Sequence, residues 1–211
     1  MYRALTWWLL GQDLDVADPA AVAAHATHPA IEIGTDPDQP FVTVDGTDVS
    51  GPIRDRPVSN AVSAVASVPA VRSHLIARQR DIIARACAET GGIVAEGRDI
   101  GTVVAPDAPV KVFLTAAEAA RARRRAADLT ADPAATVEVT QAEHARRDRL
   151  DAPQTGLAAA AVPIDSTALG LAEVIDAIVS LARTRHPEAA QRPLAGHQVP
   201  QQPGADPAWR S

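Results

Sequence analysis

The sequence predicts an α/β fold in which helices flank a parallel sheet, and three observations carry this prediction. From Ile93 onward, apolar runs of strand length alternate with segments of helical periodicity. The run Val110–Leu114 is apolar at nearly every position, as expected of a strand that is covered on both faces. Leu171–Ala182 is amphipathic, which predicts a closing helix.

Helices are predicted to dominate the first 90 residues. Met1–Leu10 carries apolar residues at helical spacing. A second helix begins at Asp18-Pro19 and runs to about His28, because proline suits the first helical position. Two further helices are predicted at Ser59–Ala66 and Pro69–Ala88.

Three short strands are predicted between the second and third helices. Ile31–Gly34 and Phe41–Val44 are apolar and are bounded by turn-forming residues. Asp45-Gly46 is a strong hairpin signal, since both residues tolerate the positive φ of a tight turn. The third strand is therefore predicted at Thr47–Val49.

The segment after this helical region carries the clearest chemistry. Gly91-Gly92 ends a helix, and Ile93-Val94-Ala95 then predicts a buried strand with Arg98 and Asp99 at its carboxyl end. Open α/β sheets bind ligands at that edge. Arginine offers a charged fork for phosphate, and a carboxylate accepts from an amino or hydroxyl group of the same ligand. A surface ion pair beside a turn is the alternative.

The remaining elements follow from local signals. Thr115 with Glu118 predicts a capping box that starts a helix, and Thr140 with Glu143 predicts another. Ala131–Val139 is predicted to be a loop, and Ala161–Asp165 the last strand. Beyond Arg183 the composition turns to Pro, Gln, Gly and Ala without periodicity, which predicts a disordered tail.

Composition limits the classes of function. The single cysteine, Cys87, excludes an intrachain disulfide and is expected to be a small buried residue. The six histidines show no metal-ligand spacing, so no metal site is predicted from protein side chains. A net charge of −6 argues against a general nucleic-acid binder. No signal peptide or long apolar segment is present, which favours a cytoplasmic protein without a membrane partner.

The basic residues of this sequence are almost all of one type. All but one of the 20 are arginine, the exception being Lys111. Several arginines nevertheless cluster where ligand-binding loops would lie, namely Arg98, Arg121 with Arg123 to Arg125, and Arg146, Arg147 and Arg149. A solvated face is expected of most of them.

Six motifs in serial order resemble bacterial cytidylate kinase. The resemblance covers roughly Met1 to Ala182, and the order of the motifs is more specific than any one of them. The motifs are Met1-Tyr2-Arg3-Ala4 with Trp7, Asn60-Ala61-Val62-Ser63, Pro69-Ala70-Val71-Arg72, Glu96-Gly97-Arg98-Asp99-Ile100-Gly101-Thr102, Val112-Phe113-Leu114-Thr115-Ala116, and Arg147-Asp148 with Asp151.

This resemblance implies a P-loop nucleoside monophosphate kinase fold and transfer of the ATP γ-phosphate to CMP or dCMP. Mg²⁺ with ATP would be the cofactor, and a monomer is expected. The resemblance places Tyr2 and Arg3 near the acceptor nucleotide, and it places Ser63, Arg98 and Asp99 at the cytosine. Arg72 would contact the phosphate or sugar of that nucleotide, together with the catalytic residues Arg147 and Asp151. Arg123 would lie at ATP.

The resemblance also implies a domain layout. Residues 1–182 would form the kinase-like domain, with an acceptor-binding insert at about 31–66 and a lid at about 121–150. Residues 183–211 would form the tail.

Two departures from the family pattern matter. ATP phosphates are held by a glycine-rich loop that ends in Gly-Lys-Ser or Gly-Lys-Thr, but the only lysine, Lys111, lies within a predicted strand. In the family this loop lies just upstream of the Met-Tyr-Arg segment. We therefore expect the chain to begin after it, at an internal methionine, and to be N-terminally truncated, without the loop and the first core strands. Gln154 also stands where the family has an arginine.

Three interpretations follow. The first is a (d)CMP kinase read from a wrong internal start, which would give CDP or dCDP once the upstream segment is restored. The second is a non-catalytic remnant or nucleotide-binding fragment that is unable to bind ATP. The third keeps the kinase class but changes the acceptor to another nucleotide or a small alcohol, and Arg98-Asp99-Ile100-Gly101-Thr102 disfavours it.

Overall fold

In the computed structural model of this chain, the structure describes residues 1–12, 14–128 and 156–186. The chain forms two compact units, Met1–Ala168 and Leu169–Ser211, which are considered separately. The predicted loop Ala131–Val139 and the second capping box lie outside the described residues, as does the tail beyond residue 186.

A helical core forms the first part of the larger unit, as predicted. Helix α1 (Tyr2–Gly11) buries Leu5 and Leu9 completely. Helix α2 (Pro19–His25) begins where the Asp18 side chain accepts a hydrogen bond from the Ala20 amide at 2.9 Å. The core cluster is made of Ala4, Leu5, Leu9, Val22, Ala26, Ile31, Val44, Val49, Val65, Val68, Val71 and Leu75.

Two further helices continue this core. The short 3₁₀ helix η1 (Pro52–Arg54) precedes α3 (Arg56–Ser67), and α4 (Pro69–Thr90) follows it. Helix α4 ends at Gly91, whose φ of 82° is the left-handed conformation that glycine adopts at helix ends. Cys87 lies in the last turns of α4 and is exposed, so the prediction that it is buried was wrong. Ala86 is the residue of this turn that faces the interior.

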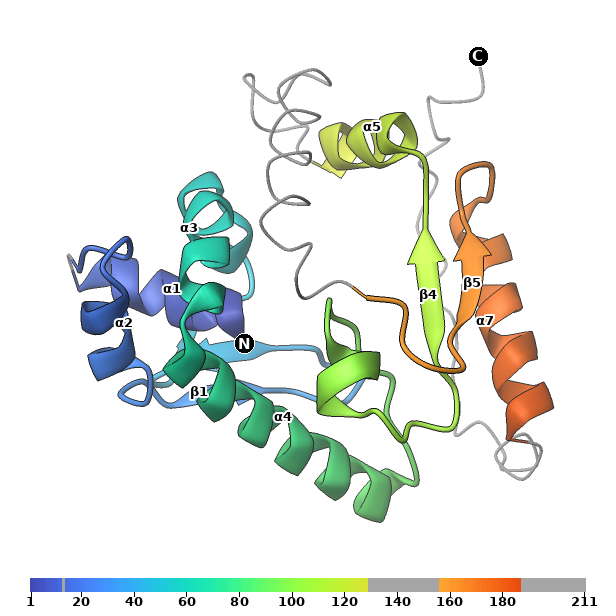
Figure 1. Cartoon of the computed structure of the whole chain (residues 1–211), viewed down its shortest axis with the longest axis horizontal. Helices are drawn as coiled ribbons and strands as arrows, with labels where there is room; N and C mark the ends of the chain where they lie inside the picture. The colour runs from blue at the N-terminus through green and yellow to red at the C-terminus, as the bar shows by residue number, and fades with distance from the viewer. Residues whose placement is uncertain (13, 129–155, 187–211) are drawn as a thin grey trace. The chain divides into compact units, whose positions relative to one another are not determined.

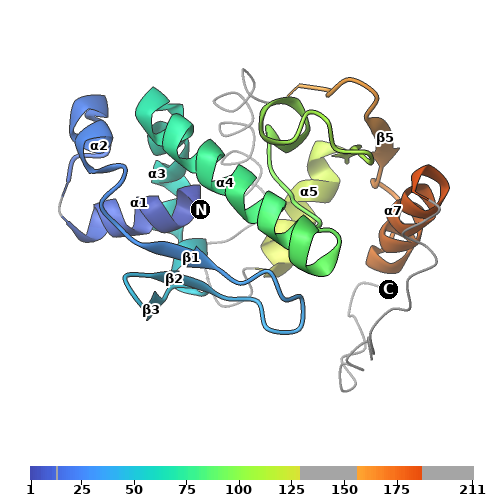
Figure 2. The ribbon, with the colours of Figure 1, turned by 90° about the horizontal axis from the view of Figure 1, so that it is seen from below.

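The three predicted short strands are present, and they form an antiparallel sheet. Strands β1 (Ile31–Ile33), β2 (Val42–Val44) and β3 (Thr47–Asp48) pair in that order. The Asp45-Gly46 turn has φ values of 49° and 78°, as the hairpin signal predicted. Helix α4 runs along this sheet (Figure 2), and Arg78 Nη2 on α4 donates to the Ile31 carbonyl at 2.8 Å.

A second sheet supplies the predicted parallel pairing. Strands β4 (Val112–Thr115) and β5 (Val162–Asp165) run side by side in the same direction (Figure 1), with Val112 opposite Val162. Among the described residues, this sheet has two strands. Helix α5 (Glu118–Asp128) follows β4.

The Thr115–Glu118 capping box is absent, which corrects that prediction. Thr115 is the last residue of β4, where its hydroxyl donates to the Ile164 carbonyl at 3.4 Å. Helix α5 begins at Glu118, and the first helical hydrogen bonds go to the Ala117 carbonyl. Pairing with β5 therefore holds Thr115 in the strand.

The predicted buried strand at Ile93–Glu96 was also wrong. These residues belong to no strand, and Val94 is 93% exposed. The sequence is apolar enough for a strand, but a strand is stable only when a neighbour completes its hydrogen bonds. No described residue pairs with it.

In the smaller unit, α7 (Leu171–Arg185) is the predicted closing helix, although it runs beyond the expected end at Ala182. The Gly170 amide donates to Glu173 Oε2 at 2.7 Å, which caps its first turn. Leu171, Ile175 and Val179 are exposed on it. Within the described ranges, we found no helix that combines the length and the apolar character needed to cross a membrane.

Candidate functional site

Three of the predicted site residues come together from distant parts of the sequence. Tyr2 lies in the first turn of α1, Arg72 in the first turn of α4, and Asp99 directly before the π-helix η2 (Ile100–Val104). Arg72 Nη2 donates to Asp99 Oδ2 at 2.5 Å. Asp99 is only 5% exposed, so this pair is largely removed from water. Removing either partner would leave the other charge in a poorly solvated position, which is costly.

Tyr2 contributes a buried polar atom that has no hydrogen-bond partner among the described residues. Its hydroxyl is buried, and the described residues offer it no hydrogen bond. Burial raises the pKa of Tyr2 above its usual value, and the negative charge of Asp99 raises it further, while Arg72 acts in the opposite direction. The phenol is therefore neutral near pH 7 and can both donate and accept. An unsatisfied buried hydroxyl is costly, so a ligand that bonds to it gains affinity.

The backbone around η2 explains why Asp99 faces Arg72. The Asp99 carbonyl accepts from the amides of Val103 at 2.8 Å and Val104 at 3.2 Å, which closes the turn. Arg80 on α4 donates to the Val104 carbonyl at 3.1 Å and to the Val103 carbonyl at 2.7 Å. Helix α4 thus holds Arg72 and, through Arg80, the turn that carries its partner.

Arg80 was not identified from the sequence, although a signal for it exists. It follows Arg72 by eight residues, which places it about 80° around the helix from Arg72, within one broad face. An arginine on the same face as a predicted site residue was therefore a candidate for holding the loop beside it.

Arg3 is placed in the same region but is used by the fold. Its Nη1 donates to the Ile53 carbonyl at 2.7 Å and to the Ser59 hydroxyl at 3.0 Å. These bonds join α1 to η1 and α3. Arg3 therefore fixes the helix that carries Tyr2, and its role toward a nucleotide stays a prediction.

The other predicted residues are less concentrated. Ser63 is half-buried on α3, and Arg98 is exposed although the adjacent Asp99 is buried. Arg123 is exposed on α5. Arg147 and Asp151, together with Gln154, lie outside the described residues.

One arginine of the cluster on α5 is not simply solvated. Arg124 donates to the Ser166 hydroxyl at 3.1 Å and to the Ser166 carbonyl at 2.5 Å. The Ser166 hydroxyl in turn donates to the Thr115 carbonyl at 2.9 Å. Helix α5 is thereby tied to the carboxyl ends of both parallel strands.

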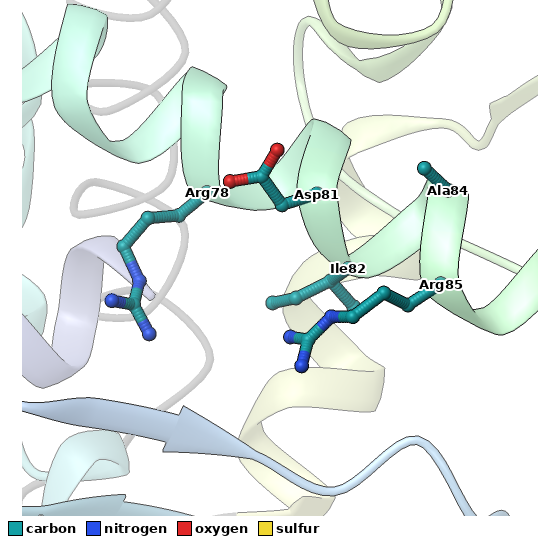
Figure 3. Close-up of a pocket in the computed structure, with 5 residues that line it drawn as sticks. All are labelled: Arg78, Asp81, Ile82, Ala84 and Arg85. Carbon is teal, nitrogen blue, oxygen red and sulfur yellow. The ribbon is translucent and has the colours of Figure 1, made fainter.

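A pocket of about 580 Å³ lies along α4, away from the predicted site residues. Arg78 and Arg85 extend toward the same side of the helix, whereas Asp81 points to the other (Figure 3). One Arg78 nitrogen is already bonded to Ile31, so part of this charge serves the fold. No group of three metal-binding side chains occurs among the described residues.

Comparison with known proteins gives a consistent result. The family model for cytidylate kinase matches residues 1–184. The cytidylate kinase of Streptomyces griseus is 48% identical over 187 residues, covering 85% of this chain and 77% of the relative. That of Streptomyces coelicolor is 48% identical over 188 residues, covering 87% and 79%. That of Geobacillus kaustophilus is 42% identical over 190 residues, covering 88% and 83%.

The matched region includes every predicted site residue, and its first part contains the Tyr2, Arg72 and Asp99 grouping. The observed parallel pair with its helices agrees with the α/β fold expected from the motifs. This chain belongs to the cytidylate kinase family.

Proposed function

We propose that this chain acts on CMP and dCMP as phosphate acceptors, with ATP as donor, and that Tyr2, Arg72 and Asp99 form the pocket for the base. The observation that carries the proposal is an ion pair between half-buried Arg72 and buried Asp99, beside a buried Tyr2 hydroxyl to which the described residues offer no hydrogen bond. Membership in the cytidylate kinase family supports the same substrate class.

Cytosine suits this group of donors and acceptors. Its exocyclic amine donates, and its ring nitrogen and carbonyl oxygen accept. Asp99 uses one oxygen for Arg72, so its remaining lone pairs can accept from the amine. Arg72 keeps further N–H groups for the acceptors. Uracil presents a carbonyl where cytosine has the amine, and this would place two acceptors face to face at Asp99.

Phosphoryl transfer proceeds by attack of an acceptor phosphate oxygen on the γ-phosphorus, with cleavage of its bond to the β,γ-bridging oxygen and release of ADP. Ser63 and Arg98 are proposed to contact the cytosine, Arg147 and Asp151 to hold the acceptor phosphate and sugar, and Arg123 to reach ATP. The segment at about 31–66 is proposed as the acceptor-side insert and that at about 121–150 as the lid.

The described residues do not fit Mg²⁺ or the ATP phosphates. They hold no cluster of three metal-binding side chains, and in the whole sequence Lys111 is followed by Val112, so a Gly-Lys-Ser or Gly-Lys-Thr loop is absent. We propose that turnover needs such a loop from outside the 211 residues. The alternative is a nucleotide-binding fragment without kinase activity. Translation of the DNA upstream of the Met1 codon separates the two, because an in-frame phosphate-loop motif supports the kinase and a stop codon supports the fragment.

Calorimetric titration with CMP, dCMP, UMP and ATP tests the acceptor pocket in the chain as it stands. CMP and dCMP are expected to bind, UMP more weakly, and ATP negligibly. Asp99→Ala and Arg72→Ala should each weaken CMP binding by about thirtyfold or more, since loss of one partner of a desolvated charge pair costs about 2–5 kcal/mol. Asp99→Asn should cost less because the amide keeps one acceptor.

Arg85→Ala is the matched control, an exposed arginine on the same helix as Arg72. It should leave CMP affinity unchanged. Unaltered CMP binding by Asp99→Ala, or micromolar ATP binding without CMP binding, would contradict the proposal.

A further inference from the structure

Helix α4 holds the turn that carries Asp99 at two separate points. At the first, the Arg72 guanidinium bonds to the Asp99 side chain. At the second, Arg80 donates to the carbonyls of Val103 and Val104, the last two residues of η2. The two arginines are eight residues apart on one helix, which corresponds to about 12 Å of a rigid rod. Both the beginning and the end of the turn are therefore fixed to the same element.

The carbonyls that Arg80 holds are those that η2 leaves open. Within η2, the hydrogen bonds go to the Asp99 carbonyl and, from the Ala105 amide at 2.7 Å, to the Ile100 carbonyl. The last carbonyls of a helix have no partner inside it, and a basic side chain can supply one. Single turns of π-helix are rare and frequently occur at functional sites.

One peptide group connects Arg80 to the backbone of Asp99. The carbonyl of Val103 and the amide of Val104 belong to the same peptide group. That carbonyl accepts from Arg80 at 2.7 Å, and that amide donates to the Asp99 carbonyl at 3.2 Å. Loss of the Arg80 side chain therefore releases the group that holds Asp99, while the side chain of Asp99 keeps its bond to Arg72.

The position of Asp99 matters most for the choice between cytosine and uracil. In the proposed pocket, an oxygen of Asp99 accepts from the cytosine amine, whereas uracil presents a carbonyl at that place. A fixed carboxylate favours the amine and repels the carbonyl. A carboxylate that can move loses part of its bond to cytosine and can also retreat from uracil, so the difference between the two bases shrinks.

We propose that Arg80 is a positioning residue that sets the preference for cytosine over uracil, by fixing the backbone of Asp99 through η2. This inference rests on the proposed function, because it takes Asp99 as the acceptor of the cytosine amine. Arg80 contacts the turn and not the base, so its whole effect on the nucleotide passes through Asp99.

Calorimetric titration of the full 211-residue chain with CMP, and displacement of CMP by UMP, test the proposal. Arg80→Ala should weaken CMP binding about tenfold and UMP binding about twofold or less, so that the preference falls about fivefold. A merely structural role would lower the amount of competent protein for both nucleotides equally and leave the preference unchanged.

A double-mutant cycle tests whether Arg80 acts through Asp99. In an Asp99→Ala background, Arg80→Ala should weaken CMP binding by less than about twofold, because the residue that it positions is already gone. Equal losses in the two backgrounds would mean that Arg80 acts on CMP by another route.

Two further variants complete the experiment. Arg80→Lys keeps the charge but not the fork that spans two carbonyls, so it should recover part of the preference, and it gives the same test if the alanine variant does not fold. Arg85→Ala removes an exposed arginine of α4 that makes no hydrogen bond to η2, and it should leave both affinities unchanged.

An unchanged preference in Arg80→Ala, or equal losses in the two backgrounds, would overturn the inference. If Asp99→Ala still weakened CMP binding in that case, the acceptor pocket would stand and only the role of Arg80 would be rejected. Unaltered CMP binding by Asp99→Ala would instead reject the acceptor pocket, and the role of Arg80 with it.

Discussion

The first 90 residues and the segment from Gly91 to Ala168 have similar apolar composition but use it differently. Every member of the core cluster lies between Ala4 and Leu75. In the later segment, Val94, Leu114 and Leu157 are more than half exposed. The two segments therefore differ in the packing partners of their apolar side chains and not in how hydrophobic they are.

The two sheets show why partners differ. An antiparallel hairpin closes through a two-residue turn, so β2 and β3 find each other locally through Asp45-Gly46. Parallel strands are joined by long crossovers and need cover on both faces. The pair β4–β5 joins residues far apart in the sequence, since Val112 pairs with Val162.

Hydrogen exchange gives the largest contrast between the two regions. Amides in the buried part of α4, near Leu75, should exchange about a thousandfold or more slowly than in an unfolded chain, because they open only with the core. Amides of 93–97 should exchange at nearly the unfolded rate, since they make no backbone bond. Mass spectrometry of peptides from each segment measures both rates. Protection of 93–97 in the isolated chain would break the comparison.

A pair of leucine truncations compares the regions energetically. Leu5→Ala removes a fully buried side chain and should lower the free energy of unfolding by about 2–5 kcal/mol. Leu114→Ala removes an exposed one and should change it by about 0.5 kcal/mol or less. Urea unfolding followed by tryptophan fluorescence gives both values. Similar losses would mean that β4 is packed as tightly as α1.

Arg80→Ala probes the link between the regions, because Arg80 on α4 holds two carbonyls of η2. Loss of these bonds should cost about 1–3 kcal/mol locally and weaken CMP binding, since the turn that carries Asp99 is loosened. Arg80→Lys should restore part of the lost stability and part of the lost CMP affinity. Calorimetry and exchange rates of Val103 and Val104 amides measure the effect. Unchanged exchange at those amides would show that the turn holds itself.

The smallest effect is spectroscopic and concerns Tyr2, the only tyrosine in the sequence. Absorbance near 295 nm should report a pKa above 10.0 in the folded chain, and about 10 in urea. Because the folded pKa is raised, this contribution to stability is complete below pH 10 and is lost as pH rises through the folded value. Asp99→Asn should lower the folded pKa and Arg72→Ala should raise it. Opposite shifts would show that Tyr2 does not sense this pair.

Local signals predicted much of the fold. Pro69 and Gly91 mark the ends of α4, and Asp45-Gly46 marks the turn between β2 and β3. Each of these signals depends only on residues a few positions away in the sequence. The prediction of a strand at Ile93–Glu96 was wrong, because the residues of a segment do not determine whether a neighbouring strand is present to pair with it. The Thr115 cap and the burial of Cys87 failed for the same reason, since distant neighbours decide them.

The sequence predicted which residues belong to the candidate site but not which of them contact one another. Tyr2, Arg72 and Asp99 were each named from motifs, but Asp99 was grouped with its neighbour Arg98. The structure pairs Asp99 with Arg72, which is 27 positions away, and leaves Arg98 exposed. Arg98 and Asp99 lie in a bend directly before η2, so the local backbone, and not their adjacency in the sequence, decides where each side chain points.

Pro163 has a consequence for how this molecule can associate. A sheet with two open edges can grow without limit, each added strand offering a new edge to the next, as in fibrils. Here the outer side of β5 lacks a donor at Pro163, so growth on that side is blocked. Strand addition is therefore confined to the β4 side, and among the described residues this two-stranded sheet cannot extend in both directions.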